Sequence, residues 1–310
     1  MFKYILHYRW ADIRQMMDND RSPQNECAAD MKGKVCLVTG ATSGVGREAV
    51  LALAAHGASI VMINRSVEKS EAICAEIRSR YHTETAFFTA DFTNLREVHD
   101  AADAILRAYP RIDVLINNAG IHCTKKTYTQ DHIETVFCVN HLASFLLTYK
   151  LLERMKQYPG SRIIQVNSQG HRFGGLNVKD VNWEKRHYTG LRGYGASKTA
   201  QLLTVREFAD MLRGTGVTIN AMHPGAVRSA IGENNGPLYR WFKRTVLAGA
   251  LVDPAISGRA IHYLAAAPEL ASVSGQYFNL THPEKPAPHA LDRKIGKIIW
   301  DISMKMAGLG

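Results

Sequence analysis

The chain is poor in the residues and motifs that mark several protein classes. Its 310 residues include only five cysteines, which are scattered along the chain and form no Cys-x-x-Cys pair. This spacing argues against a disulfide-rich secreted scaffold and predicts free thiols in a reducing compartment. The chain also has no His-Glu-x-x-His motif and no cluster of cysteine and histidine, so we expect no bound metal.

Long apolar runs are missing as well. Residues 1–10 are apolar and basic, but they are too short to span a bilayer and lack the pattern of a secretory signal. Two interpretations stay open for them: an amphipathic helix on a membrane surface, or one packed on its own domain, which we favour. Residues 22–25 are typical of a linker, so residues 1–30 form an N-terminal extension.

Acidic residues are outnumbered, with 28 Asp and Glu against 38 Lys and Arg, which gives a net charge of +10. The excess fits either an ordinary solvated surface or attraction to anions, such as a phosphorylated cofactor or an acidic membrane. No nucleic-acid-binding motif accompanies it, so we expect no nucleic-acid partner. Charged residues make up 21% of the chain, which is typical of a globular protein.

From residue 34 onward, apolar strand patterns alternate with helical ones. Strands are predicted at 35–38, 59–63, 85–90, 112–116, 162–166 and 217–221. Continuous apolar strands separated by helices predict an α/β fold, a Rossmann-type doubly wound parallel sheet with helices on both faces. We place this single domain at residues 31–285 and a C-terminal helical tail at 286–310.

A glycine-rich turn, Thr39 to Gly46, joins the first strand to a helix. Its Gly-x-x-x-Gly-x-Gly spacing differs from the commoner dinucleotide fingerprint, and an ordinary strand-to-helix turn is the alternative. Glycines let backbone approach a pyrophosphate, and a helix N-terminus attracts anions. We therefore predict cofactor contacts at Gly40, Thr42, Ser43, Gly44, Val45 and Gly46.

The second strand ends at Arg65, about twenty residues past the glycine turn, where an NAD-binding domain carries an acid for the ribose. A guanidinium at this place favours the 2′-phosphate of NADP, although a solvent-facing arginine is the alternative. Asp91 ends the third strand. It is predicted either to hydrogen-bond the adenine or to cap the helix that follows.

Two further residues, which follow a strand-end serine, suit proton transfer. Ser168 follows the fifth strand, and Tyr194 and Lys198 lie four apart on one face of a predicted helix. A phenol has a pKa of about 10 and is a poor base at neutral pH. A nearby ammonium favours the phenolate and lowers that pKa, which suits general acid/base work.

Together these motifs resemble the short-chain dehydrogenase/reductase family: Thr39-Gly-x-x-x-Gly-x-Gly46, Asn117-Asn-Ala-Gly120, and Tyr194-x-x-x-Lys198 after a strand-end serine. The resemblance implies hydride transfer between NADP(H) and a carbonyl or alcohol. It implies that Tyr194 is the general acid/base, that Ser168 holds the reacting oxygen, and that Lys198 binds the nicotinamide ribose. Asn140 would hold a relay water, with a buried asparagine bonded to backbone as the alternative. Asn167 departs from the serine that the family usually has before the catalytic serine.

The resemblance implies further cofactor contacts at Asn118, Ala119, Gly120, Pro224 and Gly225, with Val227 and Ser229 beside the carboxamide. Residues 231–251 would form a substrate lid. The aromatic and basic residues of this segment suit an apolar substrate or a membrane surface. An amphipathic helix packed on the core is an equally weighted alternative.

The long link between Ser168 and Tyr194, and residues 296–309, resemble the retinol dehydrogenase-like branch, which acts on lipophilic aldehydes, retinoids and ketones. We therefore expect an NADP(H)-dependent carbonyl reductase with a small-molecule substrate. It should be cytoplasmic, with peripheral membrane contact and a homo-oligomer left open. The alternative is a catalytically silent NADP(H)-binding sensor, which would have no chemical need for Ser168, Tyr194 and Lys198 together.

Overall fold

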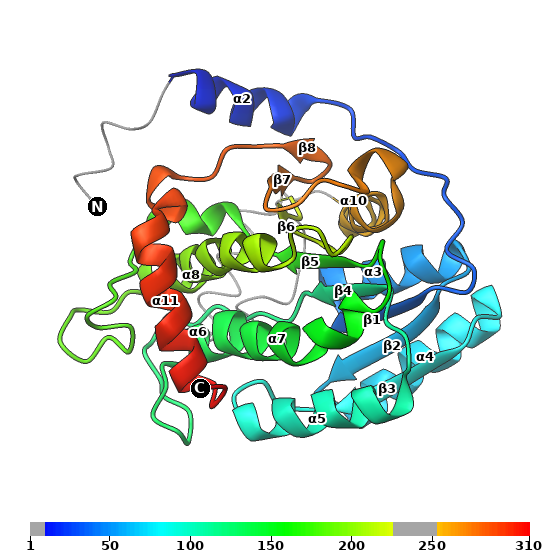
Figure 1. Cartoon of the computed structure of the whole chain (residues 1–310), viewed down its shortest axis with the longest axis horizontal. Helices are drawn as coiled ribbons and strands as arrows, with labels where there is room; N and C mark the ends of the chain where they lie inside the picture. The colour runs from blue at the N-terminus through cyan, green and yellow to red at the C-terminus, as the bar shows by residue number, and fades with distance from the viewer. Residues whose placement is uncertain (1–9, 226–252) are drawn as a thin grey trace.

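A single mixed sheet forms the centre of the computed structural model, which describes residues 10–225 and 253–310 (Figure 1). Its strand order is β3-β2-β1-β4-β5-β6-β7-β8, and all neighbouring pairs are parallel except β7–β8. The strands are β1 (Val35–Thr39), β2 (Ser59–Asn64), β3 (Thr85–Thr89), β4 (Val114–Asn117), β5 (Arg162–Val166), β6 (Thr218–His223), β7 (Tyr277–Asn279) and β8 (His282–Pro283). This arrangement confirms the predicted Rossmann-type fold, to which the structure adds the short edge pair β7–β8.

The boundaries of the predicted strands differ from the prediction by at most two residues, and β5 matches it at both ends. The predicted strand at 112–116 begins only at Val114, and Asp113, just before it, turns its carboxylate toward the start of β1. There it accepts a hydrogen bond from the Val35 backbone N–H at 3.0 Å and pairs with Lys34 and Arg111. These cationic and backbone donors lower the pKa of Asp113 against the opposing effect of burial.

Helices cover both faces of the sheet, each closing its own apolar cluster. One face carries α3 (Gly44–Ala55), α4 (Val67–Tyr81) and α10 (Pro254–Ala266). The other carries α5 (Leu95–Ala108), α7 (Ala143–Lys156), α8 (Gly190–Met211) and α11 (Arg293–Met306). Alternation along β1 divides its side chains between the clusters, with Leu37 in one and Val38 in the other.

The chain enters α7 through an irregular turn. Three residues of α6 (Thr135–Phe137) lead into a π-helical turn, η1 (Cys138–Leu142), which continues directly into α7. Single π-helical turns within helices often occur at functional sites, and this one contains Asn140. By length and composition residues 135–156 could cross a membrane, but 83% of the apolar window is buried inside the fold.

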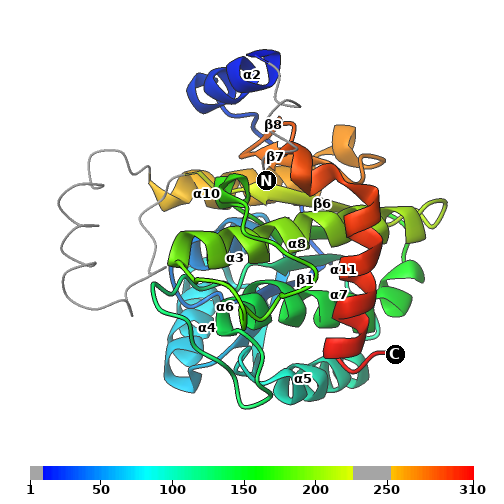
Figure 2. The same cartoon turned by 90° about the vertical axis from the view of Figure 1, so that its left-hand side faces the viewer.

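The C-terminal tail packs along α7 and α8 through α11, as Figures 1 and 2 both show. The Trp300 ring lies edge-on against Phe145 and Phe208, with centroid distances of 4.9 and 4.7 Å. Aromatic contacts of this kind add to the free energy gained from apolar burial. The tail helix therefore shields the outer apolar surface of α7 and α8.

The N-terminal extension contains a helix that the sequence analysis did not predict, α2 (Trp10–Arg21), lying across the β8 edge (Figure 1). Gln15 and Asn19 both donate side-chain hydrogen bonds to the Pro283 carbonyl. Trp10 is 84% exposed. The two interpretations of residues 1–10 stay open, because residues 1–9 lie outside the described residues.

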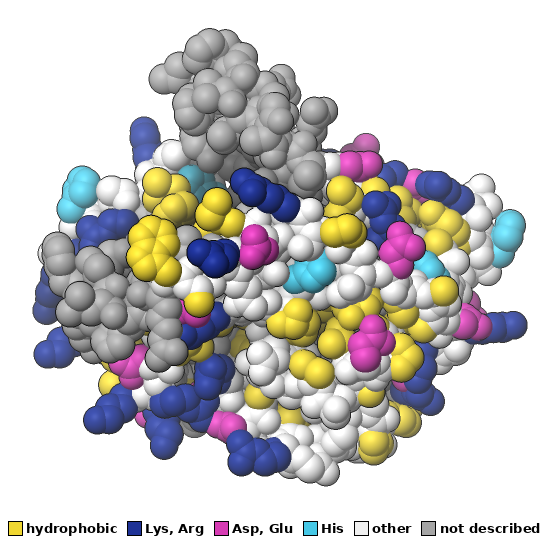
Figure 3. All heavy atoms as spheres, turned by 90° about the horizontal axis from the view of Figure 1, so that it is seen from above, with side chains coloured by type: hydrophobic (Ala, Val, Ile, Leu, Met, Phe, Trp, Pro, Cys, Tyr) yellow, Lys and Arg dark blue, Asp and Glu magenta, His cyan; other side chains and the backbone are white. Residues whose placement is uncertain are grey.

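The surface charge is unevenly distributed. On the face seen from above, Lys and Arg side chains gather along one margin, at the lower left of Figure 3. Apolar, acidic and further basic side chains are interspersed over the rest of that view. A gathering of basic side chains can attract anions.

We expect Trp300→Ala to lower the free energy of unfolding by about 3 kcal/mol, because it removes the aromatic contacts of α11 with α7 and α8. Chemical denaturation should show this loss. Ile298→Ala is the matched control on the same helix, since Ile298 is 42% exposed. Its effect should stay within about 0.5 kcal/mol, and equal losses for the two variants would contradict the assignment.

Candidate active site

The glycine turn between β1 and α3 requires its glycines. Gly40 and Gly44 have left-handed φ values of 66° and 55°. A Cβ atom on Gly40 would lie 2.9 Å from Ala119 Cα, and one on Gly46 would collide with the Gly40 carbonyl. The backbone thus forms a close-walled loop at a helix N-terminus, where N–H groups and the helix dipole attract a phosphate. The predicted glycines therefore fit a dinucleotide pyrophosphate.

The other predicted residues of this turn differ in their surroundings. Ser43 occupies the N-cap position of α3, yet its side chain makes no capping hydrogen bond. Thr42 is half-buried in the loop. Val45 is buried in the core on the α3 face of the sheet, so only its backbone can face a phosphate.

The segment after β4 holds the glycine turn in place. The Asn118 amide donates to the carbonyls of Thr39 and Gly40 at 2.9 and 3.0 Å. In return, the Thr39 hydroxyl accepts from the backbone N–H groups of Asn118 and Ala119 at 3.0 and 2.9 Å. Asn118 and Ala119 were predicted as cofactor contacts, and the structure shows them supporting the loop on which a cofactor would lie.

Asn64, which the sequence analysis did not single out, also supports this loop. It is buried at the end of β2, where its Oδ1 accepts from the Ala41 N–H at 2.7 Å and its amide donates to Ser70. A buried amide can satisfy a backbone donor that would otherwise be costly to leave unpaired. The sequence feature that could have identified Asn64 was its position at the end of a predicted strand, just before Arg65.

Arg65 extends from the end of β2 with 73% of its side chain exposed, and its Nη1 is 3.8 Å from an Asp91 carboxylate oxygen. Such an exposed pair contributes little stability, so the guanidinium can exchange this partner for a phosphate. Asp91 binds the backbone N–H and hydroxyl of Thr93. Asn94 is the N-cap of α5, so the helix-capping alternative for Asp91 is wrong.

Ser168 and Tyr194 meet across Gly170. A Cβ atom there would lie 2.7 Å from Tyr194 Cδ1 and 3.3 Å from Ser168 Oγ. The Ser168 Oγ accepts a hydrogen bond from the Gly170 N–H at 3.0 Å, which leaves the hydroxyl proton to donate elsewhere. The His122 ring lies edge-on to Tyr194 with a centroid distance of 5.5 Å. The structure thus brings the predicted hydroxyl and phenol together.

Lys198 lies one helical turn beyond Tyr194 on α8, with its Nζ 5.9 Å from the Tyr194 ring centroid. The Nζ donates to the Val166 carbonyl at 2.8 Å. Lys198 is buried, and burial lowers its pKa to about 7. This lowering occurs because a low-dielectric interior disfavours the ammonium form.

Asn140 lies close to the same group from the π-helical turn. Its Oδ1 accepts from the Ile121 N–H at 2.7 Å, while its amide donates to the Ile121 carbonyl and the Ser197 hydroxyl. A Cβ on Gly120 would be 3.3 Å from Asn140 Oδ1 and 3.8 Å from Lys198 Nζ, so this backbone also lines the cluster. The asparagine bonded to backbone is what the structure shows, and the relay-water role stays a prediction.

The unexpected asparagine before Ser168 has a structural explanation. Asn167 is buried, and its Oδ1 accepts from the Ser168 N–H at 2.8 Å. Its amide donates to the Lys198 carbonyl at 3.0 Å and to Gln201 Oε1 at 2.7 Å. The Asn167 side chain therefore joins the end of β5 to α8. It fixes the backbone of Ser168 relative to that of Lys198. Asn167 and Gln201 are functional candidates that the sequence analysis did not assign.

The turn after β6 carries Pro224 and Gly225. Gly225 has a left-handed φ of 83°, and the Pro224 carbonyl accepts from the Ser257 hydroxyl of α10. The turn lies at the same sheet edge as the glycine loop, because carboxyl ends of parallel strands lie at one edge. Val227, Ser229 and the predicted lid at 231–251 lie outside the described residues.

The thiols and acidic groups give no sign of a metal centre. All five cysteines lie in the described part of the chain and are unpaired, as predicted. Within residues 10–225 and 253–310, no group of three or more His, Cys, Asp or Glu side chains is placed to hold a metal ion.

Comparison with known proteins agrees with this geometry. Residues 34–238 match the family model described as short chain dehydrogenase. Human retinol dehydrogenase 13 is 36% identical over 91% of this chain and 86% of its own length. The crystal structure of an uncharacterized protein from Mycobacterium paratuberculosis superposes with a TM-score of 0.73 at 27% identity, covering 90% of this chain and 95% of that one.

A blue fluorescent protein from a metagenomic library, solved in complex with NADPH, superposes with a TM-score of 0.63 at 26% identity. The match covers 84% of this chain and 99% of that chain. The chain belongs to the short-chain dehydrogenase family, in its retinol dehydrogenase-like branch. It is accordingly an oxidoreductase of carbonyls and alcohols that uses a nicotinamide cofactor.

The buried Lys198 should make stability depend on pH. Its pKa falls from 10.5 to about 7 on folding, so the folded state disfavours the ammonium. This cost is fully present below pH 7 and diminishes as the pH rises toward 10.5. Lys198→Met removes this cost. The variant should therefore be more stable relative to wild type at pH 6 than at pH 9.5, and the difference in its free energy of unfolding should be on the order of 3 kcal/mol. The free energies of unfolding of the two proteins can be measured by urea denaturation over this pH range. The same pH dependence in both would contradict the lowered pKa of Lys198.

Proposed function

We propose that the protein is an NADP(H)-dependent oxidoreductase that interconverts a lipophilic aldehyde or ketone and its alcohol, with Tyr194 as general acid/base. The observation that carries this proposal is the meeting of Ser168 Oγ and the Tyr194 ring at Gly170, with the buried Lys198 one turn behind. These groups lie at the sheet edge that also carries the glycine loop. A sensor would have no chemical need for this arrangement.

The roles of the residues follow from their chemistry. A bound nicotinamide supplies or accepts the hydride at the substrate carbon. In reduction, the Tyr194 phenol gives its proton to the carbonyl oxygen, and in oxidation the phenolate removes the alcohol proton. The Ser168 hydroxyl donates to the same oxygen and holds it in line, while the Lys198 ammonium favours the phenolate and binds the ribose hydroxyls.

The preference for NADP(H) rests on Arg65. Its guanidinium is largely exposed beyond β2 and has only a long contact with Asp91. A planar guanidinium binds a phosphate through charge-assisted hydrogen bonds, and no acid occupies this position to bind the ribose hydroxyls of NAD. The structural neighbour solved with NADPH supports the same cofactor.

The lipophilic substrate rests on the relatives and on the surface near the site. Phe173, five residues after Ser168, is 48% exposed, and Leu191, near the start of α8, is 55% exposed. Because single exposed apolar side chains are common on proteins, the relatives carry most of this proposal. The relative named retinol dehydrogenase 13 supports a retinoid or a similar aldehyde as substrate. The unpaired thiols support a reducing compartment such as the cytoplasm.

The first test follows NADPH absorbance with the purified protein and a panel of retinal, medium-chain aldehydes, steroid ketones and aromatic ketones. We expect NADPH oxidation with at least one lipophilic class. Tyr194→Phe should lower turnover at least about 1,000-fold, because the proton donor is lost, and should leave the Kd for NADPH within about twofold. Retained turnover in this variant would remove Tyr194 from its role. Tight NADPH binding with no turnover across the panel would support the sensor.

Cofactor preference is tested by Arg65→Asp. Loss of the charge-assisted bonds and repulsion of the 2′-phosphate should lower the preference for NADPH over NADH by at least about tenfold in kcat/KM. Arg80→Asp is the matched control, because Arg80 is also an exposed arginine but lies on α4 beside Glu76. An unchanged preference in Arg65→Asp, or an equal change in the control, would contradict the role of Arg65.

A further inference from the structure

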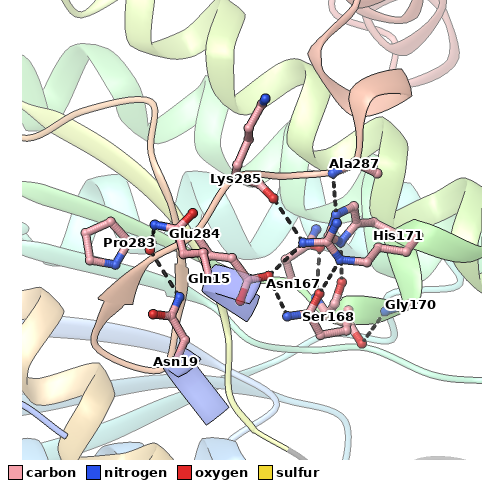
Figure 4. Close-up of polar contacts among 12 residues, drawn as sticks. Gln15, Asn19, Asn167, Ser168, Gly170, His171, Pro283, Glu284, Lys285 and Ala287 are labelled. Atoms are coloured by element: carbon pink, nitrogen blue, oxygen red, sulfur yellow. Dashed lines mark hydrogen bonds and ion pairs between the residues drawn. The ribbon is translucent and has the colours of Figure 1, made fainter. Parts of the chain in front are cut away.

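The turn that carries Ser168 is fastened to a segment more than a hundred residues away. After Ser168 the chain forms a short 3-10 helix, η2 (Gln169–Phe173). Residues 283–289, which we call the C-terminal strap, run alongside this turn between β8 and α11 (Figure 4). Three side chains make the connection: His171 from the turn, and Glu284 and His289 from the strap, with His289 Nε2 donating to the His171 carbonyl at 2.9 Å.

His171 bridges the serine and the strap. Its Nδ1 donates to the Ser168 carbonyl at 2.7 Å, and its Nε2 accepts from the Ala287 N–H at 3.0 Å (Figure 4). Only the neutral ring with the proton on Nδ1 can make both bonds. Burial lowers the pKa of His171 to about 3, which keeps the ring neutral. The edge of Tyr277 packs against the ring and fixes its plane.

Glu284 closes the other side of the turn. One carboxylate oxygen accepts from Gln169 Nε2 and from Arg172 Nη2, both at 2.7 Å. Arg172 also donates to Gln169 Oε1 at 2.7 Å and to the Lys285 carbonyl at 2.9 Å. The residue after Ser168 and the last polar residue of the turn are therefore held by one buried carboxylate.

The ion pair between Arg172 and Glu284 contributes little net stability. Its carboxylate is fully buried and the arginine side chain is only 19% exposed. Removing such charges from water offsets most of their mutual attraction, so a buried pair often contributes more to geometry than to stability. The His289 ring of the strap also bonds to the serine turn, but burial lowers the pKa of His289 and so disfavours its charged form. The pair therefore suits a positioning role.

The strap is itself held from outside by α2. The Pro283 carbonyl accepts from Gln15 and Asn19 at 3.3 and 3.2 Å (Figure 4). Lys285 pairs with Asp12 at 2.9 Å. Side chains from α2 and from the serine turn thus converge on the same segment. Helix α2 therefore restrains the position of the strap, and the strap in turn restrains the position of the serine turn.

We infer that His171 and Glu284 are positioning residues that hold the Ser168 hydroxyl in its productive place, which makes the C-terminal strap part of the active-site support. This inference rests on the proposed function. Ser168 Oγ is oriented by the Gly170 N–H, and the place of Gly170 depends on the turn that His171 and Glu284 clamp. A displacement of about 1 Å at such a hydroxyl can lower turnover about 100-fold.

The kinetic test uses NADPH with all-trans-retinal and nonanal as probes. Glu284→Ala and His171→Phe should each lower kcat at least about tenfold, with the Kd for NADPH within about twofold. Glu284→Gln keeps the oxygen that accepts from Gln169 and Arg172, and His171→Asn keeps a donor for the Ser168 carbonyl. These two variants should therefore retain most of the wild-type kcat. In a Ser168→Ala background the same substitutions should have no further effect on kcat, because their effect passes through the serine.

A second measurement does not depend on turnover. Hydrogen–deuterium exchange of residues 168–174 in the NADPH-loaded protein should increase in Glu284→Ala and His171→Phe. Arg162→Met is the matched control: Arg162 is buried at the opposite end of β5 and binds the carbonyls of Leu264 and Ala267. It should lower stability without changing this exchange or kcat.

The outcomes separate the two proposals. A wild-type protein inactive on every carbonyl of the panel contradicts the proposed function, and the exchange arm still decides whether the strap orders the turn. Unchanged exchange, or a kcat loss that adds fully to that of Ser168→Ala, overturns the positioning inference. Should Glu284→Ala fail to fold, the pair His171→Phe and His171→Asn gives the same comparison.

Discussion

The geometry of the site depends on three asparagine side chains at the carboxyl ends of β2, β4 and β5. Asn64 ties the glycine turn to β2, Asn118 ties it to the segment after β4, and Asn167 ties the serine to α8. An amide both donates and accepts, so one side chain can satisfy a backbone N–H and a backbone carbonyl from different elements. Strands that would otherwise be related only through the sheet are thereby fixed at the edge where the cofactor and substrate would meet.

Burial sets the electrostatics around this edge. His171 is kept neutral by the low-dielectric interior, and the same effect brings the pKa of Lys198 down to about 7. A cation with few competing charges nearby acts strongly on the phenol beside it, because the surrounding protein screens it poorly. The exposed Arg65 is in the opposite situation, where solvent screens its pair with Asp91 and leaves the guanidinium exchangeable.

Local patterns were sufficient to predict the sheet, the glycine turn and the positions of Ser168, Tyr194 and Lys198, since strand alternation and helical spacing are visible over a few residues. They could not reveal β8, which is two residues long and includes a proline, or the docking of α2 on Pro283, which lies 264 or more positions away. Asn167 was recognised only as a departure from the family pattern. Its bridging role needed the packing of β5 against α8, which no local period encodes.

The placement of the strap has a consequence for the order of biosynthesis. Helix α2 is translated long before its acceptor at Pro283, which lies 264 or more positions later. The serine turn likewise lacks its Ala287 and Glu284 partners until more than a hundred further residues have been synthesised. The nucleotide-binding half can fold while synthesis continues, because domains generally form from the N-terminal side. The support of Ser168 is therefore completed after the glycine cradle, and a chain stopped short of residue 284 lacks the clamp on Ser168.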